Sequence, residues 1–317
     1  MSKTQLAGGN GGARWRSRNN RRRIGNGLML SLAGLATALA LAPLVWILAY
    51  VLVKGGRGLN LAFLTHLPQA MGTVGGGVLH AIEGSLVLVL IGVVLAVPVG
   101  IAAAFYAVDH AHTVLGTLLR FGTDVLSGIP SIVVGLFCYA VVVKVQGHYS
   151  ALAGGIALAI LMLPLVIRTT EEMVKLVPRS LAEASLALGA PQWKTSLKVV
   201  LPSAVVGVAT GTLLAIARAA GETAPILFTA LGNDHYEIGQ IVSQGIRNGQ
   251  GVLEIVGRIL GQPVDALPLT LWKYSQQPYP ERVQQSWTIA LVLMLLVLAL
   301  NVGARVIIAR RQRHLKG

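Results

Sequence analysis

Long apolar runs separated by polar segments dominate the pattern of hydrophobic and polar positions in this chain. The runs lie near residues 28–53, 82–108, 121–144, 151–168, 203–231 and 287–309. Each reaches the ~17 residues that a helix rising 1.5 Å per residue needs to cross the hydrocarbon core of a bilayer. The pattern therefore predicts an all-α membrane protein with about six transmembrane helices.

Composition supports a membrane protein. Hydrophobic residues make up 54% of the chain and charged residues only 12%, whereas soluble domains carry roughly a quarter charged residues. The net charge of +14 would point to nucleic acid in a soluble protein, but seven Lys and Arg residues gather before Gly27. We predict that residues 1–27 form a disordered basic cytoplasmic tail near anionic lipid and that the protein has no nucleic-acid partner. RNA binding by this tail is the alternative.

The first apolar run is a retained span, because a signal peptide has a shorter apolar region of ~7–15 residues. Positive charge then sets the orientation. With both termini cytoplasmic, the inner segments hold eighteen Lys and Arg residues and the outer segments seven, which is the bias expected for an even number of spans. The predicted organisation is the tail, a first helix and external loop over 28–80, a membrane core over 81–309, and a basic cytoplasmic tail over 310–317.

Two connecting segments are long enough to have structures of their own. One is cytoplasmic, over residues 169–202, and the other is external, over residues 232–286. Apolar residues recur at helical spacing in the external loop, which predicts short amphipathic helices on the outer face. We expect three polar residues at the ends of spans to be solvated or interfacial: His80, Glu83 and Asp124.

The cytoplasmic loop has the signals of a short capped helix. Ser180 and Glu183 have the spacing of a capping box, with Ser180 as the N-cap. Gly189 suits the left-handed position that follows a helix. The helix would have about nine residues and would present an apolar face, including Ala184 and Leu188, before a second short helix. Such a face packs either on its own membrane domain or in a groove of a partner.

The same loop resembles the EAA loop of ABC importer permeases, with Ser185 and Val199 in place of Ala and Ile. Two segments in the spans, residues 128–137 and 218–225, resemble motifs of phosphate permeases. The chain therefore resembles the PstA-type permease subunits of bacterial phosphate importers, and the Ala-Pro that follows Gly-Glu-Thr favours this type over the sister PstC type. The matching residues are Glu183-Ala184-Ser185, Gly189, Val199, Leu201-Pro202, Gly128 to Phe137 and Arg218 to Pro225.

The resemblance implies a type I ABC importer permease-like bundle in the bacterial inner membrane, which passes phosphate by alternating access without catalysing a reaction. It implies three partners: a PstC-like sister permease, PstB-like ATPase subunits that bind ATP-Mg, and an external PstS-like phosphate-binding protein. Residues 189–195 lack the second glycine of a phosphate loop, so we expect no cofactor in this chain. The residues assigned to ATPase coupling are Ser180, Glu183, Ala184, Leu188 and Gly189.

The chemistry of the fifth span fits an anion path. Arg218 lies well inside the bilayer, where an arginine costs ~2.5–3.5 kcal/mol on insertion scales. Glu222 follows four residues later on the same helical face, with Thr223 beside it. The pair would neutralise itself when the path is empty, and the guanidinium would bind an oxyanion bidentately. A purely structural ion pair is the alternative.

A proline within the third span is the other informative residue. Pro130 is predicted to kink this helix, and the hydroxyls of Ser127 and Ser131 lie beside it. These residues either line the path or merely bend the helix. At the level of the whole protein, the alternatives to phosphate import are the sister subunit, transport of another oxyanion or solute, and a stand-alone secondary transporter.

Overall fold

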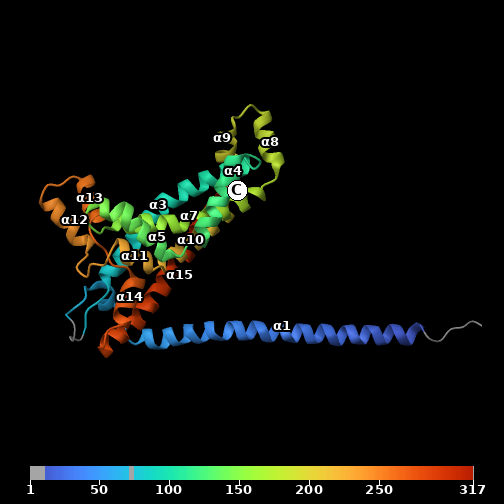
Figure 1. Cartoon of the computed structure of the whole chain (residues 1–317), viewed down its shortest axis with the longest axis horizontal. Coiled ribbons are helices and arrows are strands. Elements are labelled where there is room, and N and C mark those ends of the chain that lie inside the picture. Colours follow the sequence, from blue (N-terminus) through green and yellow to red (C-terminus); the bar gives the residue numbers. More distant parts are fainter. Residues whose placement is uncertain (1–10, 71–74, 317) are drawn as a thin grey trace, which may run out of the picture. The chain divides into compact units, whose positions relative to one another are not determined.

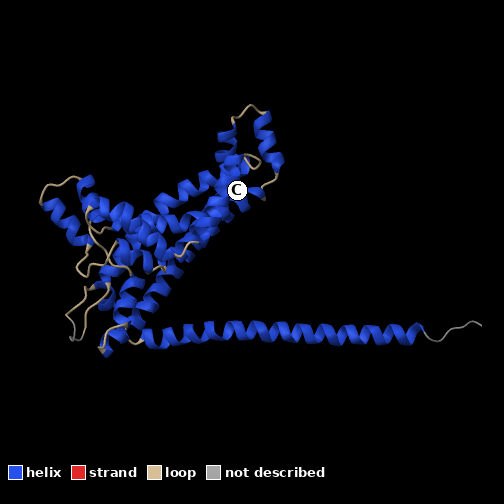
Figure 2. Ribbon diagram, viewed as in Figure 1, coloured by secondary structure: helices blue, strands red, loops and turns tan. Residues whose placement is uncertain are grey.

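The computed structural model describes residues 11–70 and 75–316, with side chains for residues 25–70 and 75–306. The described chain is built from helices and loops, and its β structure is a parallel bridge between Leu231 and Val264 (Figure 2). It divides into two compact units, residues 1–53 and residues 54–317.

The described part of the first unit belongs to one helix, α1 (Gly11–Gly56), whose last three residues are counted in the second unit. Residues 25–56 of this helix are long and apolar enough to cross a membrane. The helix also includes residues 11–27, where the sequence analysis predicted a disordered tail; residues 1–10 of that tail lie outside the described residues. A helix that has formed in the apolar run extends readily into the arginines before it, because propagation costs far less than nucleation.

The second unit is a bundle whose long helices are α3, α7, α10 and α15, together with a bent pair. The pair begins with α4 and continues through α5, the π-helix η1 and α6. Five helices of the described chain are long and apolar enough to span a membrane, and the bent pair raises the number to as many as six, in agreement with the prediction. The bounds are α3 (Leu79–Asp109), α4 (Val114–Gly128), α5 (Ser131–Cys138), η1 (Tyr139–Val143), α6 (Lys144–Gln146), α7 (Ala151–Lys175), α10 (Leu201–Ala220) and α15 (Pro280–Lys316).

The core of this unit forms where α7 packs between α3 and α10. Glycines permit the close approach of α3 and α7. A Cβ atom at Gly155 would lie 2.4 Å from the Ile91 side chain, and one at Gly100 would lie 2.7 Å from Val166. Small residues let helix backbones approach closely in membranes, where van der Waals contact rather than the hydrophobic effect drives helix association.

The third span is broken, not merely kinked. Its two halves, α4 and the segment that begins with α5, are bent by 104° at Ile129 and Pro130. Ile129 has an extended backbone (φ −73°, ψ 129°) because proline disfavours helical geometry in the residue before it. The predicted bend at Pro130 is therefore found, but it is a full break of the span rather than a kink within one helix.

The fifth span also departs from the continuous helix predicted over residues 203–231. It begins with α9 (Gln192–Thr195) and the π-helix η2 (Ser196–Val200), continues as α10, and stops at Gly221. The chain resumes a helical course in α11 (Ala224–Thr229) after three residues. Pro225 lies in the first turn of α11, where its missing N–H costs nothing, whereas it would break the interior of one long helix.

Short helices lie at the two ends of this unit (Figure 1). At one end are α8 (Arg179–Ala187) and α9, and at the other are α12 (Ile238–Arg247) and α13 (Val252–Gly261). The predicted short helices of the external loop are thus confirmed. This loop also contains α14 (Leu267–Ser275), and α2 (Leu61–Thr65) follows the first span.

Candidate functional site

The arginine of the fifth span lies beside its predicted partner. Arg218 is in the last turn of α10, and its Nε is 3.8 Å from Oε1 of Glu222. Glu222 lies in the non-helical link that follows, where its backbone N–H donates to the carbonyl of Ala219. The structure brings the two residues together as predicted, but at a helix end rather than on one continuous helix.

The guanidinium of Arg218 faces outward from this chain. Its side chain is 59% exposed and that of Glu222 is 17% exposed. The 3.8 Å separation is longer than the ~2.7–2.9 Å of a charge-assisted hydrogen bond, so the donors of the guanidinium are available to another group. Arg218 belongs to a span, so its exposed face needs cover from water or from another protein rather than from lipid.

The two broken spans meet beside this pair. A Cβ atom at Gly135 of α5 would lie 2.7 Å from Cα of Pro225 in α11. Ser131 is one helical turn before Gly135, and Thr223 is two residues before Pro225, so the beginnings of the two short helices lie close together. A helix start offers backbone N–H groups without partners inside the helix, and its partial positive charge favours an anion.

The residues around Pro130 differ in how well the structure fits their predicted roles. Pro130 is the N-cap of α5 and marks the break, and Ser131 begins that helix. Ser127 instead donates its hydroxyl hydrogen to the carbonyl of Thr123, at 2.9 Å. Its hydroxyl oxygen can accept, but its proton is committed within α4.

The cytoplasmic loop contains the predicted nine-residue helix, α8, but its start differs. Pro178 is the N-cap, Ser180 lies within the first turn, and no side-chain cap occurs. The predicted capping box of Ser180 and Glu183 is therefore wrong. The cause is Pro178, whose fixed φ of −58° and extended ψ of 128° begin the helix earlier. Its carbonyl accepts from the N–H of Leu181 to close the first turn.

The end of α8 is as predicted. Gly189 has a φ of +83° and follows the C-cap Leu188. Its N–H donates to the carbonyl of Leu186 at 2.9 Å, and the N–H of Ala190 donates to that of Ser185 at 3.2 Å. These are the two hydrogen bonds of a Schellman motif. The hydroxyls of Ser185 and Thr195, 2.8 Å apart, then join α8 to α9.

The apolar face of this loop is uncovered. Leu188 is 89% exposed and Trp193 is 64% exposed, and further apolar side chains beside them are also exposed. Among the described residues, the membrane domain leaves these side chains exposed, so they are accessible to a partner. The further exposed residues are Leu181, Leu186 and Leu197.

A charged recess that the sequence did not predict lies between α4 and α7. It encloses about 200 Å³. Glu171 accepts from both Arg120 and Lys175, each at 2.7 Å, and Arg168 pairs with Asp124. Asp124 is therefore an ion-pair partner that helps join two helices, rather than only a solvated end. The spacing of Glu171 and Lys175 was the one sequence signal for this network.

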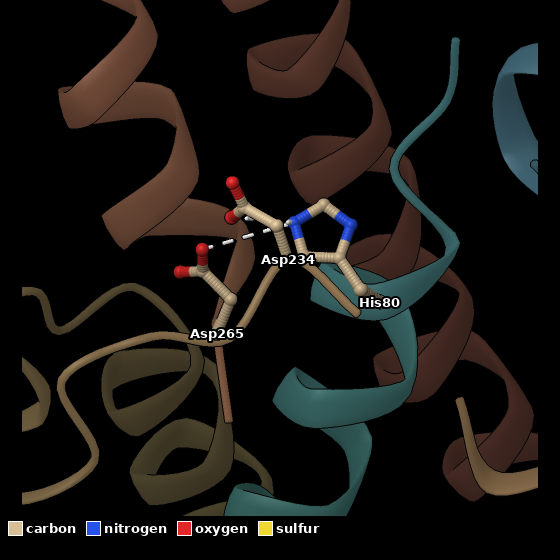
Figure 3. Close-up of side chains that lie close together, drawn as sticks. All are labelled: His80, Asp234 and Asp265. Carbon is tan, nitrogen blue, oxygen red and sulfur yellow. Dashed lines mark ion pairs between the residues drawn. The ribbon is translucent and has the colours of Figure 1, made fainter. Parts of the chain in front are cut away.

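A second unpredicted cluster lies at the N-terminal end of α3. His80 was expected to be solvated or interfacial, yet it is fully buried and points toward Asp234 and Asp265 (Figure 3). Lys273 of α14 pairs with both carboxylates. Burial acts to raise the pKa of Asp265, but His80 and Lys273 outweigh it and lower this pKa below its usual range. Burial likewise opposes the charge of Lys273, and Asp265 nonetheless raises the pKa of this lysine.

These features define the class of the protein. The family described as "Binding-protein-dependent transport system inner membrane component" matches residues 96–314, which include α8 and both broken spans. The fold agrees: a chain of the inward-facing MetNI methionine ABC transporter superposes with a TM-score of 0.51 at 17% identity, covering 74% of this chain and 94% of that one. The predicted ABC importer permease-like fold is thus confirmed.

Curated relatives narrow the family further. The phosphate transport system permease protein PstA of Yersinia pestis is 41% identical over 94% of this chain and 92% of its own. The proteins of the same name from Xylella fastidiosa (Temecula1) and Mycobacterium tuberculosis (H37Rv, PstA 1) are 38% and 36% identical, over 92% and 93% of this chain and 95% and 92% of theirs. This chain belongs to the PstA family of phosphate transport permeases, which confirms the resemblance.

Proposed function

We propose that this chain is the PstA-type subunit of an ATP-driven importer and that it passes inorganic phosphate across the inner membrane by alternating access. The observation that carries the proposal is the exposed guanidinium of Arg218, which lies beside Glu222 at the break of a membrane span. An arginine in that position requires either an anion path or a protein surface that covers it.

The two breaks give the path its chemistry. Phosphate would accept two parallel hydrogen bonds from the planar guanidinium of Arg218. The carboxylate of Glu222 would weaken this attraction so that the anion is passed on rather than trapped. The start of α5 at Ser131 and the segment at Thr223 add backbone N–H groups and hydroxyls, as discontinuous helices do in other transporters.

The exposure of Arg218 also supports a path that lies between subunits. A PstC-like sister permease would supply the facing wall, and a PstS-like protein would deliver phosphate from outside. We propose that the chain itself is non-catalytic and holds no cofactor. ATP-Mg would be bound and hydrolysed by PstB-like subunits, whose groove would receive the exposed apolar side chains of α8 and α9.

The test is a double replacement. If Arg218 only neutralises Glu222, then changing both residues to alanine should preserve assembly and transport, because a paired charge can be replaced by apolar residues at little cost. If Arg218 meets phosphate, the double variant should assemble normally and take up no phosphate. Uptake of labelled phosphate would be measured in cells lacking the native chain, and assembly by co-purification with the ATPase.

Two further variants sharpen the result. Arg218→Lys keeps the charge but not the bidentate geometry, so it should also lose most uptake. Arg247→Ala removes an exposed arginine from the last turn of α12 and serves as the matched control, with normal uptake expected. Competition by arsenate but not by sulfate would support phosphate as the cargo. A fully active double variant would leave Arg218 with a structural role only.

A further inference from the structure

A buried histidine without a hydrogen-bond partner lies at the N-terminal end of α3. The side chain of His80 is completely buried, and neither Nδ1 nor Nε2 has a hydrogen-bond partner among the described residues. Leaving a buried polar group unpaired is destabilising, so the absence of a partner calls for an explanation. Its Nε2 atom points at two carboxylates that come from distant parts of the chain (Figure 3).

The distances between these groups are those of metal ligands rather than of hydrogen bonds. Nε2 of His80 lies 3.7 Å from Oδ2 of Asp265 and 3.8 Å from Oδ1 of Asp234. A charge-assisted hydrogen bond would be about 2.7–2.9 Å long. Two ligands of a tetrahedral zinc ion, each ~2.1 Å from the metal, stand about 3.4 Å apart. A shift of a few tenths of an ångström would bring Nε2 to that distance from each oxygen, and the three atoms all lie within 4.8 Å of one another.

The ammonium group of Lys273 is the positive charge that pairs with the two carboxylates of this cluster. Its Nζ pairs with Oδ2 of Asp265 and lies 3.3 Å from Oδ1 of Asp234, so it contacts the same two oxygens that face His80. The lysine side chain is 28% exposed and sits on a flexible stem, so it can withdraw to solvent. A divalent ion would then neutralise the two carboxylates while His80 binds it as the neutral imidazole.

We propose that His80, Asp234 and Asp265 form a site for a divalent transition-metal ion of the zinc type, with Lys273 as the internal cation that competes for it. One nitrogen and two carboxylate oxygens are ligands that zinc accepts, and water would complete a tetrahedron on the exposed side of Asp234. Asp234 is about half exposed and so gives the ion a way in.

The site would join three segments of the chain. His80 belongs to α3, Asp234 follows α11, and Asp265 precedes α14. Neighbouring contacts already hold these segments together: Ser85 accepts from the N–H of Leu267 at 2.8 Å, and Glu83 accepts from that of Ile238 at 2.7 Å. A bound ion would lock this end of α3 to the loops around α12–α14, independently of the phosphate path.

The test uses the full-length chain, purified in detergent with a tag that contains no histidine and then stripped of metal by a chelator. Zn²⁺ alone is titrated against a competing fluorescent chelator near neutral pH, and Co²⁺ is used to record the absorption of a tetrahedral site. We expect one Zn²⁺ per chain. His80→Gln should weaken binding by at least on the order of a hundredfold and abolish the Co²⁺ absorption.

Lys273→Met should have the opposite effect, because removing the competing ammonium should strengthen Zn²⁺ binding about tenfold or more. This gain keeps the proposal testable even if His80→Gln folds poorly. His66→Gln is the matched control: this exposed histidine bonds the carbonyl of Ala62 and should leave binding unchanged. The proposal is overturned if Zn²⁺ binds equally well to His80→Gln, if Lys273→Met binds it no more tightly, or if neither Lys273→Met nor the native chain binds it.

Discussion

The glycine that ends α8 can be compared with a second glycine that has the same left-handed backbone conformation, and the comparison gives a prediction. Gly189 and Gly249 have φ values of +83° and +67°, and a Cβ atom at either would meet nothing within 4 Å. Both close Schellman motifs: the N–H of Gly249 donates to Ile246 and that of Gln250 to Gly245, at 3.1 and 2.9 Å. One glycine lies beside the proposed ATPase surface, and the other lies between α12 and α13.

Valine at either position should cost the same local free energy. Since the space is open, no steric term is added, and the cost is that of a β-branched residue at positive φ, about 1–3 kcal/mol. That cost shifts the equilibrium between the native and a rearranged helix end toward the rearranged form, by roughly 5- to 150-fold relative to the native chain. In the Gly189→Val variant the change falls on Leu188 and on the link to α9. We therefore expect weaker ATPase co-purification and a loss of most ATP-driven phosphate uptake.

The Gly249→Val variant should show the same local strain without that functional loss. Uptake would be measured in cells lacking the native chain, at matched membrane levels of each variant, and the ATPase would be quantified after affinity purification. Gly189→Asn should retain more activity than Gly189→Val, because asparagine tolerates the left-handed region. Equal uptake in the two valine variants, whether normal or lost, would refute the reasoning that α8 couples this subunit to its ATPase.

Three shorter predictions follow from the same structure. Gly135→Ala should destabilise the protein by about 1–3 kcal/mol, because its Cβ would lie 2.7 Å from Cα of Pro225, whereas Gly128→Ala has open space and should be neutral in thermal unfolding. In a Cys138→Ser background, an impermeant maleimide should label a cysteine at Gln250 but not one at Ser185 in intact cells; equal labelling would contradict the predicted orientation. The folded-state pKa of Asp265 is lowered. Its ionised form therefore stabilises the protein above about pH 4, and this stabilisation is lost as the pH falls through the folded-state pKa. With metal removed from both proteins, the unfolding temperature of the native chain should fall with this loss, and that of Asp265→Asn should not.

Local features of the fold could be predicted from the sequence because their causes are local. Apolar runs of sufficient length predicted the spans, and the helical spacing of apolar residues predicted α12 and α13. Gly189 was predicted to take the left-handed conformation because its position after an apolar helical face leaves few alternatives. The start of α8 was misplaced because two start signals, Pro178 and Ser180, stand two residues apart, and the proline begins the helix first.

Breaks in the spans were harder to predict, because hydropathy reports that a segment is apolar but not that it is straight. The tertiary amide of Pro130 is compatible with a bend of 20° or of 104°. Its neighbours decide between them: Gly135 allows α5 to approach Pro225 of α11, so contact between the displaced helices offsets the loss of helical hydrogen bonds.

The polar cluster around His80 lay beyond sequence reasoning for a different reason. His80 is separated from both aspartates by more than 150 residues in the chain, and nothing in the local sequence around any of the three residues links it to the others. Only the packing of the external loop against α3 brings His80 to Asp265. A cluster of this kind is a property of tertiary structure, and a single sequence contains no periodic signal for it.

The two breaks explain why the candidate path lies where it does. A backbone that leaves the helix inside a membrane has N–H and carbonyl groups that lipid cannot satisfy, so it is tolerated only where protein or water covers it. This chain places such a break at Pro130 and another at Gly221. The contact of Gly135 with Pro225 brings them together, and Arg218 faces outward beside the second. We propose that the cover comes from a second subunit and that a polar path runs along the surface where the two subunits meet.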